Sequence, residues 1–282
     1  MGPHGLTRRL EGIEGLDSLG EQLAAVAGKA LPEGPVKDTL SGTFLGHALH
    51  PALTDLPIGN LMSATLLDLV GGERTDEAAQ TLIGLGMLAS IPTAASGLSD
   101  WSDTFGGERR IGLLHAATNV TALLLYGGSL GARRSGRRGL GVALGAVGAG
   151  VLAVGGYLGG HLSLGKGIGV DQTAVDHEPT SWTPVVALDD LNDQEPKRVD
   201  VGDVPVMLLK RGDEIHALSD RCSHLGGPLH EGKLDEHTVT CPWHQSCFSL
   251  ADGSVVRGPA RAPQPVYETR VEGGKVSIRL RP

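Results

Sequence analysis

Two cysteines and two histidines in the last third of the chain could do chemistry together. Cys222 and His224 lie in the run CSHLGGPL, Cys241 and His244 lie in the run CPWH, and 16 residues separate His224 from Cys241. Thiolate sulfur and imidazole nitrogen both bind soft and borderline metals. This set suits either a [2Fe-2S] cluster, with both cysteines on one iron and both histidines on the other, or a single tetrahedral zinc ion.

The region around these runs resembles the Rieske [2Fe-2S] family over residues 182–282. Besides the ligand spacing, the likeness rests on GGPL at 226–229, PW at 242–243, and GPA at 258–260, which resembles the proline segment that covers the cluster in this family. Zinc remains an alternative, although zinc sets usually lie in small helical or ribbon modules. The residues that the resemblance assigns to the cluster are the ligands Cys222, His224, Cys241 and His244, the hydrogen-bond donor Ser246, and Pro259.

The sequence departs from the high-potential members of this family. Gly227 stands where those proteins have a disulfide cysteine, and Gln245 replaces the glycine that usually follows the second histidine. The site therefore resembles the ferredoxin type, and we expect a midpoint towards the lower part of the roughly −150 to +300 mV Rieske range. We interpret Cys247 as a small hydrophobic residue on the strand after the loop, although its position also allows a ligand.

Composition excludes several classes of function. The 282 residues suggest about two domains. A net charge of −8 without a basic patch argues against nucleic acid as a partner. Only 38 residues follow His244, which argues against a Rieske oxygenase because that enzyme needs a second, mononuclear iron site in a large domain after the cluster.

Four apolar stretches precede the metal-ligand runs, at about 52–70, 78–98, 111–132 and 140–162. Each is close to the ~20 residues that cross a bilayer as a helix. They predict four membrane helices, and a soluble bundle of four buried helices is the alternative. Residues 46–170 also resemble an uncharacterised family of four-helix bacterial membrane domains that is often fused to a Rieske domain. This likeness is carried by GHALHPALTDLP at 46–57, GLSDW at 97–101, HAATN at 115–119 and GGHL at 159–162.

An amphipathic helix is predicted over residues 10–31, before the membrane helices. Its apolar residues recur at spacings of three and four, which places them on one helical face. Acidic residues occupy the other side, so we expect the helix to pack against the protein rather than to lie on anionic lipid. The apolar positions are Leu10, Ile13, Leu16, Leu19, Leu23 and Val26.

These patterns predict a multidomain fold, an all-α four-helix transmembrane bundle followed by a small all-β antiparallel Rieske domain. The strands are expected at 185–188, 204–209, 215–218, 238–241, 266–271 and 276–280. The expected boundaries are an amphipathic N-terminal helix region at 1–45, a membrane domain at 46–168, a linker at 169–181 and the Rieske domain at 182–282.

Four spans would bring several ionisable residues to one membrane face, where such residues are functional candidates. The histidines are His47, His50, His115 and His161, and the carboxylates are Asp55 and Asp100. We expect a second site for haem or a metal ion, with His50, His115 and His161 as ligands and Asp55 or Asp100 orienting an imidazole. The alternative is that these histidines face interfacial water without binding metal.

The resulting functional hypothesis is a membrane-tethered carrier of single electrons between a donor and an acceptor. The partner would be a redox protein or a quinone, and the resemblance implies that the histidine ligands reach the surface where a partner docks. The alternative is an oxidoreductase whose helical domain holds a haem or metal site that exchanges electrons with the cluster. We expect a multi-pass protein of the cell membrane. The arginines at 133–138 favour an outward-facing Rieske domain, with a cytoplasmic one as the alternative.

Overall fold

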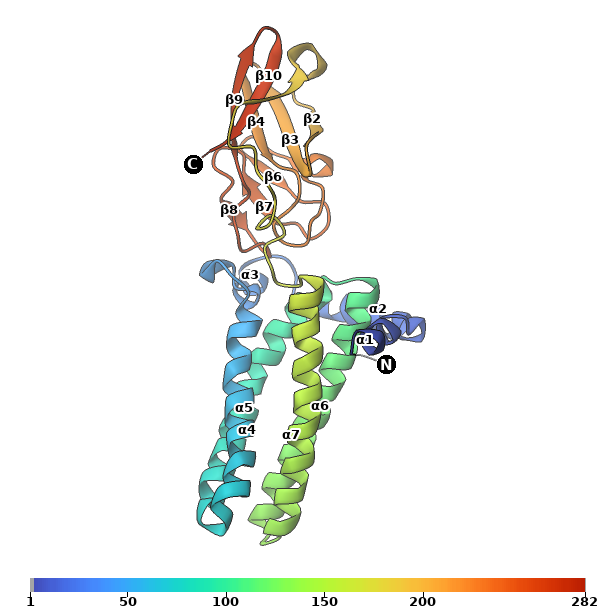
Figure 1. Ribbon diagram of the computed structural model, residues 1–282, viewed down its shortest axis with the longest axis vertical. Helices are drawn as coiled ribbons and strands as arrows, with labels where there is room; N and C mark the ends of the chain where they lie inside the picture. Colours follow the sequence, from blue (N-terminus) through green and yellow to red (C-terminus); the bar gives the residue numbers. More distant parts are fainter. Residues whose placement is uncertain (1–2, 282) are drawn as a thin grey trace. The chain divides into compact units, whose positions relative to one another are not determined.

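The computed structural model describes residues 3–281, and the chain divides into two compact units. The helical unit comprises the residues up to Leu31 together with Leu49–Ile168. The β unit comprises Pro32–Ala48 and the residues from Gly169 onwards. Figure 1 shows the helices of the first and the strands of the second.

Four long helices dominate the helical unit and confirm the four helices predicted from the apolar stretches. They form two antiparallel hairpins, α4 with α5 and α6 with α7 (Figure 1). Their bounds are α4 Leu49–Gly71, α5 Asp76–Ser102, α6 Gly106–Arg134 and α7 Arg138–Gly160, with short helical turns at Gly72–Thr75 and His161–Gly165. In the described part of the chain, three stretches are long and apolar enough to cross a membrane: Leu49–Ser102, which contains α4 and α5, Gly106–Arg134, and Arg138–Gly165. Between the hairpins lies a core that includes Leu61, Ile83, Tyr126 and Leu152.

The N-terminal region corrects the prediction of one continuous helix over 10–31. Helix α1 covers Pro3–Glu11, a 3₁₀ turn covers Glu14–Leu16, and α2 covers Asp17–Ala30. The break between α1 and α2 covers residues 12–16, which include Gly12 and Gly15. Glycine destabilises a helix interior by about 1 kcal/mol relative to alanine.

Helix α2 packs against α5 and α6, but with a different face from the predicted one. Its buried residues are Gly20, Ala24 and Ala27. A Cβ at Gly20 would lie 3.2 Å from Cδ of Arg109, so the small side chains let α2 approach α6 closely. The predicted apolar face is instead exposed at its main positions, which are Leu19, Leu23 and Val26.

The β unit is all-β and antiparallel, as predicted. Its three sheets have the strand orders β1-β10-β9, β2-β3-β4 and β5-β6-β7-β8. The strands are β1 Thr183–Ala187, β2 Pro196–Val201, β3 Val204–Arg211, β4 Glu214–Ser219, β5 Lys233–Leu234, β6 Thr238–Thr240, β7 Cys247–Ser249, β8 Val255–Arg257, β9 Tyr267–Glu272 and β10 Lys275–Leu280. Strands β2, β5 and β8 were not predicted, because they are short or polar and lack a clear alternation of apolar residues. Strand β7 is the strand expected to carry Cys247 after the second loop.

Residues 32–48, here called the cap segment, belong to the β unit although they precede the helical hairpins in the chain. The segment contains helix α3, Pro35–Ser41, and a 3₁₀ turn at Thr43–Leu45. Thr43 Oγ1 donates to the carbonyl of Ala260 at 3.0 Å, and Arg261 Nε donates to the carbonyl of Ser41 at 2.6 Å. At its end, Ala48 adjoins Gly169, since a Cβ at Gly169 would lie 3.4 Å from that of Ala48.

Candidate metal centre

The first ligand loop follows β4 and is closed by its own backbone. Cys222 N donates to the carbonyl of Gly227 at 2.9 Å, and Gly226 N donates to the carbonyl of Cys222 at 2.8 Å. Gly226 has φ of +78°, in the left-handed region that glycine adopts without strain. Gln264 also holds this loop, because its Oε1 accepts from Ser223 N at 2.7 Å.

The second ligand loop, after β6, repeats this closure. Cys241 N donates to the carbonyl of Ser246 at 2.8 Å, and Gln245 N donates to the carbonyl of Cys241 at 3.2 Å. Gln245 takes the place of Gly226 in the pattern and has φ of +59°. The usual glycine at this position is therefore explained by backbone conformation, and here a glutamine adopts the same left-handed turn.

The two cysteines of these loops lie side by side and buried. Their thiols are hydrogen-bonded to each other, which raises the pKa of Cys222 well above its usual value, with burial adding to the rise. The same bond is the main cause that lowers the pKa of Cys241 to about 7. The pair therefore gives up its first proton readily, as thiolate ligation of a metal requires.

The two histidines form the other half of the site. The ring centroids of His224 and His244 lie 5.0 Å apart, with the planes at 87°. Burial lowers the pKa of His224 well below its usual value, and the positive charges of His244, Arg261 and Lys37 lower it further. His224 is thus held as the neutral imidazole that binds metal.

Among residues 5–281, no three His, Cys, Asp or Glu side chains converge as the ligands of a single ion. The four candidate ligands are arranged as a thiol pair and an imidazole pair. Two such pairs match the two irons of a [2Fe-2S] cluster with mixed ligation.

Comparisons with known proteins agree with this geometry. A family described as Rieske [2Fe-2S] domain matches residues 181–268. The anthranilate 1,2-dioxygenase ferredoxin subunit of Burkholderia cepacia is 32% identical over 99 residues, which are 35% of this chain and 92% of that protein. The chain belongs to the Rieske [2Fe-2S] family.

A second Rieske relative is the 3-phenylpropionate/cinnamic acid dioxygenase ferredoxin subunit of Escherichia coli (strain K12), 39% identical over 92 residues, with 32% of this chain and 86% of the relative covered. Among solved structures, the ferredoxin of carbazole 1,9a-dioxygenase from Nocardioides aromaticivorans IC177 is 28% identical, with a TM-score of 0.34 and coverage of 36% of this chain and 99% of that chain. Residues 46–172 match the family described as Predicted membrane protein (DUF2231). Both resemblances seen in the sequence are therefore confirmed.

Rieske family membership implies a [2Fe-2S] cluster, and the residues around the ligand pairs fit one. A Cβ at Gly227 would lie 2.7 Å from Sγ of Cys241 and 3.1 Å from the ring of Trp243, so this position has room only for glycine. The Rieske disulfide of high-potential proteins could not form here without a shift of Cys241. Cys247 lies in β7 and is buried.

Ser246 and Pro259 lie next to the Rieske ligand loops. Ser246 is fully buried, and its Oγ accepts from Ala260 N at 3.0 Å. This bond uses a lone pair of the oxygen, so the hydroxyl hydrogen can still be donated to a cluster sulfide. Pro259 is buried in the segment that carries Ala260 and Arg261.

The two histidines are less exposed than the Rieske resemblance implies. His224 is 5% exposed and His244 is 8% exposed, whereas both rings were expected to reach the surface. A Cβ at Gly258 would lie 2.4 Å from Thr43 Oγ1 and 2.7 Å from Asp38 Oδ1, which shows how closely the cap segment covers the proline segment. Lys37 of this segment is 3% exposed, and its ammonium group donates to Glu33 Oε1 at 3.0 Å.

The Ser246 hydroxyl gives a direct test of how this Rieske site sets its potential. We expect Ser246→Ala to lower the midpoint potential by roughly 40 mV, because one hydrogen bond contributes about 1 kcal/mol and 59 mV corresponds to a tenfold change for one electron. Potentiometric titration of the reduced-protein EPR signal measures this shift. Ser254→Ala, in an exposed turn, is the matched control, and an unchanged potential in Ser246→Ala would contradict the role of the hydroxyl.

The residues predicted for a second site separate into two groups. His50 and His115 lie together, with ring centroids 6.3 Å apart. His161 instead has its Nε2 2.9 Å from Glu11 Oε1. Asp55 is exposed, Asp100 is partly buried near the end of α5, and His47 is exposed in the cap segment.

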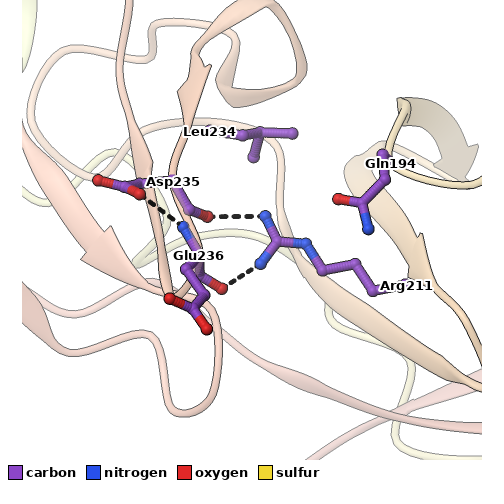
Figure 2. A pocket seen from close by; sticks show the side chains of 5 residues that line it. All are labelled: Gln194, Arg211, Leu234, Asp235 and Glu236. Carbon is purple, nitrogen blue, oxygen red and sulfur yellow. Dashed lines mark hydrogen bonds between the residues drawn. The ribbon is translucent and has the colours of Figure 1, made fainter.

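A surface pocket of ≈ 420 Å³ in the β unit is lined by none of the ligands. Figure 2 shows its lining residues, with the guanidinium of Arg211 pointing at the backbone of Asp235 and Glu236. Arg211 donates to the carbonyl of Asp235 at 2.7 Å and also to that of Glu236. These contacts tie β3 to the turn between β5 and β6.

Proposed function

We propose that the protein is a membrane-tethered Rieske ferredoxin that carries one electron at a time. In this proposal Cys222 and Cys241 hold one iron of the cluster, and His224 and His244 hold the other. The bound cluster supplies reversible one-electron chemistry. The observation that carries the proposal is the pair of identically closed loops, which presents two thiols and two imidazoles from one buried site.

An aromatic side chain next to the buried imidazoles reaches the surface. Both imidazoles are buried, whereas Trp243 is 51% exposed and its ring centroid lies 6.4 Å from that of His244. An exposed aromatic ring beside a ligand is suited to docking a partner protein. The relatives named as dioxygenase ferredoxin subunits support a protein partner, and a quinone is the second acceptor to test.

Membrane tethering is supported by the surface of the helical unit. Large apolar side chains of α4–α7 point outward, among them Leu69, Leu88, Leu124 and Val147. Large apolar side chains exposed on several neighbouring helices are expected at a membrane or protein contact. The exposed residues Leu19, Leu23 and Val26 of α2 add an apolar stripe suited to the membrane interface.

The proposed topology has four crossings. The chain leaves the β unit at Ala48 and returns to it at Gly169, and these two residues are in contact. Their proximity supports an even number of crossings between them, which α4–α7 supply. We propose that the arginine-bearing loop at 133–138 faces the cytoplasm and the Rieske domain faces outward.

The experiment is a redox titration of the full chain purified from its membrane in detergent. We expect two non-haem irons per chain, one electron per chain taken up by the cluster on reduction, and a signal of the Rieske type. Re-oxidation by a protein acceptor such as cytochrome c should slow in Trp243→Ala, whereas re-oxidation by a small quinone should be unaffected. Equal slowing with both acceptors would overturn protein docking at Trp243. Release of the chain from membranes by alkaline carbonate would overturn the tether.

A further inference from the structure

The two helical hairpins carry the same histidine arrangement. In the first, Nδ1 of His50 on α4 lies 2.9 Å from the carbonyl oxygen of Thr93 on α5. In the second, Nδ1 of His115 on α6 lies 2.8 Å from the carbonyl oxygen of Gly155 on α7. Each hairpin thus holds an imidazole of its first helix against the backbone of its second helix.

A glycine one turn further along makes each contact possible. Gly97 follows Thr93 by four residues, and a Cβ there would lie 2.7 Å from Cε1 of His50. Gly159 follows Gly155 by four residues, and a Cβ there would lie 2.8 Å from Cε1 of His115. Any larger residue at either position would push the ring away from its carbonyl partner. The same arrangement of histidine, carbonyl and glycine is therefore present in both hairpins, although their sequences differ.

The hydrogen bonds fix which ring nitrogen can bind metal. A carbonyl oxygen only accepts, so Nδ1 of both histidines carries the hydrogen and Nε2 carries the lone pair. Histidines that bind metal almost always donate their other N–H to a carboxylate, a backbone carbonyl or water, which sets ring orientation and tautomer. Asn119 Nδ2 lies 3.3 Å from Nδ1 and 3.2 Å from Nε2 of His115. Because these distances are equal, that amide lies off the axis of the Nε2 lone pair.

The two imidazoles also have the separation that one iron would require. Their centroids lie 6.3 Å apart and their planes are at 87°. An ion at about 2 Å from each of two nitrogens, with roughly 1 Å more from nitrogen to ring centre, puts the centres about 6 Å apart. We propose that the helical unit binds a haem whose iron is held axially by His50 and His115, one from each hairpin.

The number of ligands favours haem over a bare ion. A porphyrin supplies four nitrogens and leaves two axial positions, which the facing pair fills. Zinc sites use three or four protein ligands. The third histidine expected here, His161, is engaged with Glu11, which also accepts from Lys166 Nζ at 2.9 Å. This proposal goes beyond the carrier function and does not rest on the cluster ligands.

The test is a pyridine haemochrome assay with visible spectroscopy on the full chain, produced in cells supplied with a haem precursor. We expect one haem per chain, with a low-spin spectrum that carbon monoxide does not change because both axial positions are filled. His50→Ala and His115→Ala should each lose most of the haem, and Gly97→Ala or Gly159→Ala should weaken haem binding roughly 10- to 100-fold. His161→Ala is the matched control and should bind haem fully.

The outcomes separate folding from ligation. Far-UV circular dichroism of the same samples reports whether the helices of each variant have folded, and the Rieske EPR signal reports the same for the β unit; neither readout depends on haem. Wild-type protein with an intact Rieske signal and no haem would overturn the proposal. So would equal haem content in wild type and the His50→Ala, His115→Ala double variant, or a zinc ion in place of haem that the same variants lose.

Discussion

Replacing His224 by cysteine is expected to abolish the Rieske EPR signal of the reduced protein. A thiolate adds negative charge where the proposed ligation has a neutral imidazole, so any cluster that still forms would have a different spectrum and a lower potential. Cys241→Ser should prevent the cluster from assembling, with non-haem iron falling well below two atoms per chain. EPR of dithionite-reduced protein together with iron analysis measures both effects.

Cys247→Ser is the matched control for these ligand variants. Cys247 is buried in β7, close to the second loop in sequence, so its substitution changes a nearby sulfur without touching the proposed ligand set. The Rieske signal per chain should stay at the wild-type level. A spectrum unchanged in His224→Cys, or lost in Cys247→Ser, would mean that the ligands have been assigned to the wrong residues.

The second large effect is expected from Arg133, on α6. Its side chain is 0% exposed and forms ion pairs with Asp68 of α4 and Asp76 of the first turn of α5. Removing one partner of a buried ion pair costs about 3–5 kcal/mol. Arg138, 3.7 Å from Asp68 and 3.3 Å from Asp76, still compensates part of the carboxylate charge. We therefore expect Arg133→Ala to lower the free energy of unfolding by up to that amount, measured by detergent-induced unfolding of the helical unit.

Arg134→Ala is the matched control, one residue further along α6. Arg134 is exposed, and exposed substitutions usually change stability by within about 0.5 kcal/mol. Arg133→Lys should lie between the two, because it keeps the charge but loses the planar fork that reaches both carboxylates. Equal stability of Arg133→Ala and Arg134→Ala would show that the ion pairs do not hold the hairpins together.

The parts predicted correctly from sequence are those whose cause is local. The Rieske resemblance follows from two short loops and the residues that flank them, and the helices α4–α7 follow from apolar stretches of membrane length.

The parts that were missed depend on contacts between distant residues. The apolar periodicity of α2 does not show whether Leu23 packs against the protein or lies exposed on its surface, because the same residue spacing is expected in both cases. Four histidines were placed at one end of the bundle, but only the positions of Gly97 and Gly159 on the neighbouring helices select His50 and His115. The roles of Gln264 and Lys37 near the ligand loops have no local signal in the sequence.

The adjacency of Ala48 and Gly169 also makes the helical stretch between them an insertion within a single β domain. Entry and exit points that lie together are the condition under which a domain tolerates an insertion, because the host fold is left undisturbed. This has a consequence during protein synthesis. The cap segment is translated before the residues that it contacts, since Ala260 lies 217 residues after Thr43 in the chain. Such non-local contacts form late in folding. The cap segment therefore packs over Gly258 and its neighbours only after helices α4–α7 have been translated.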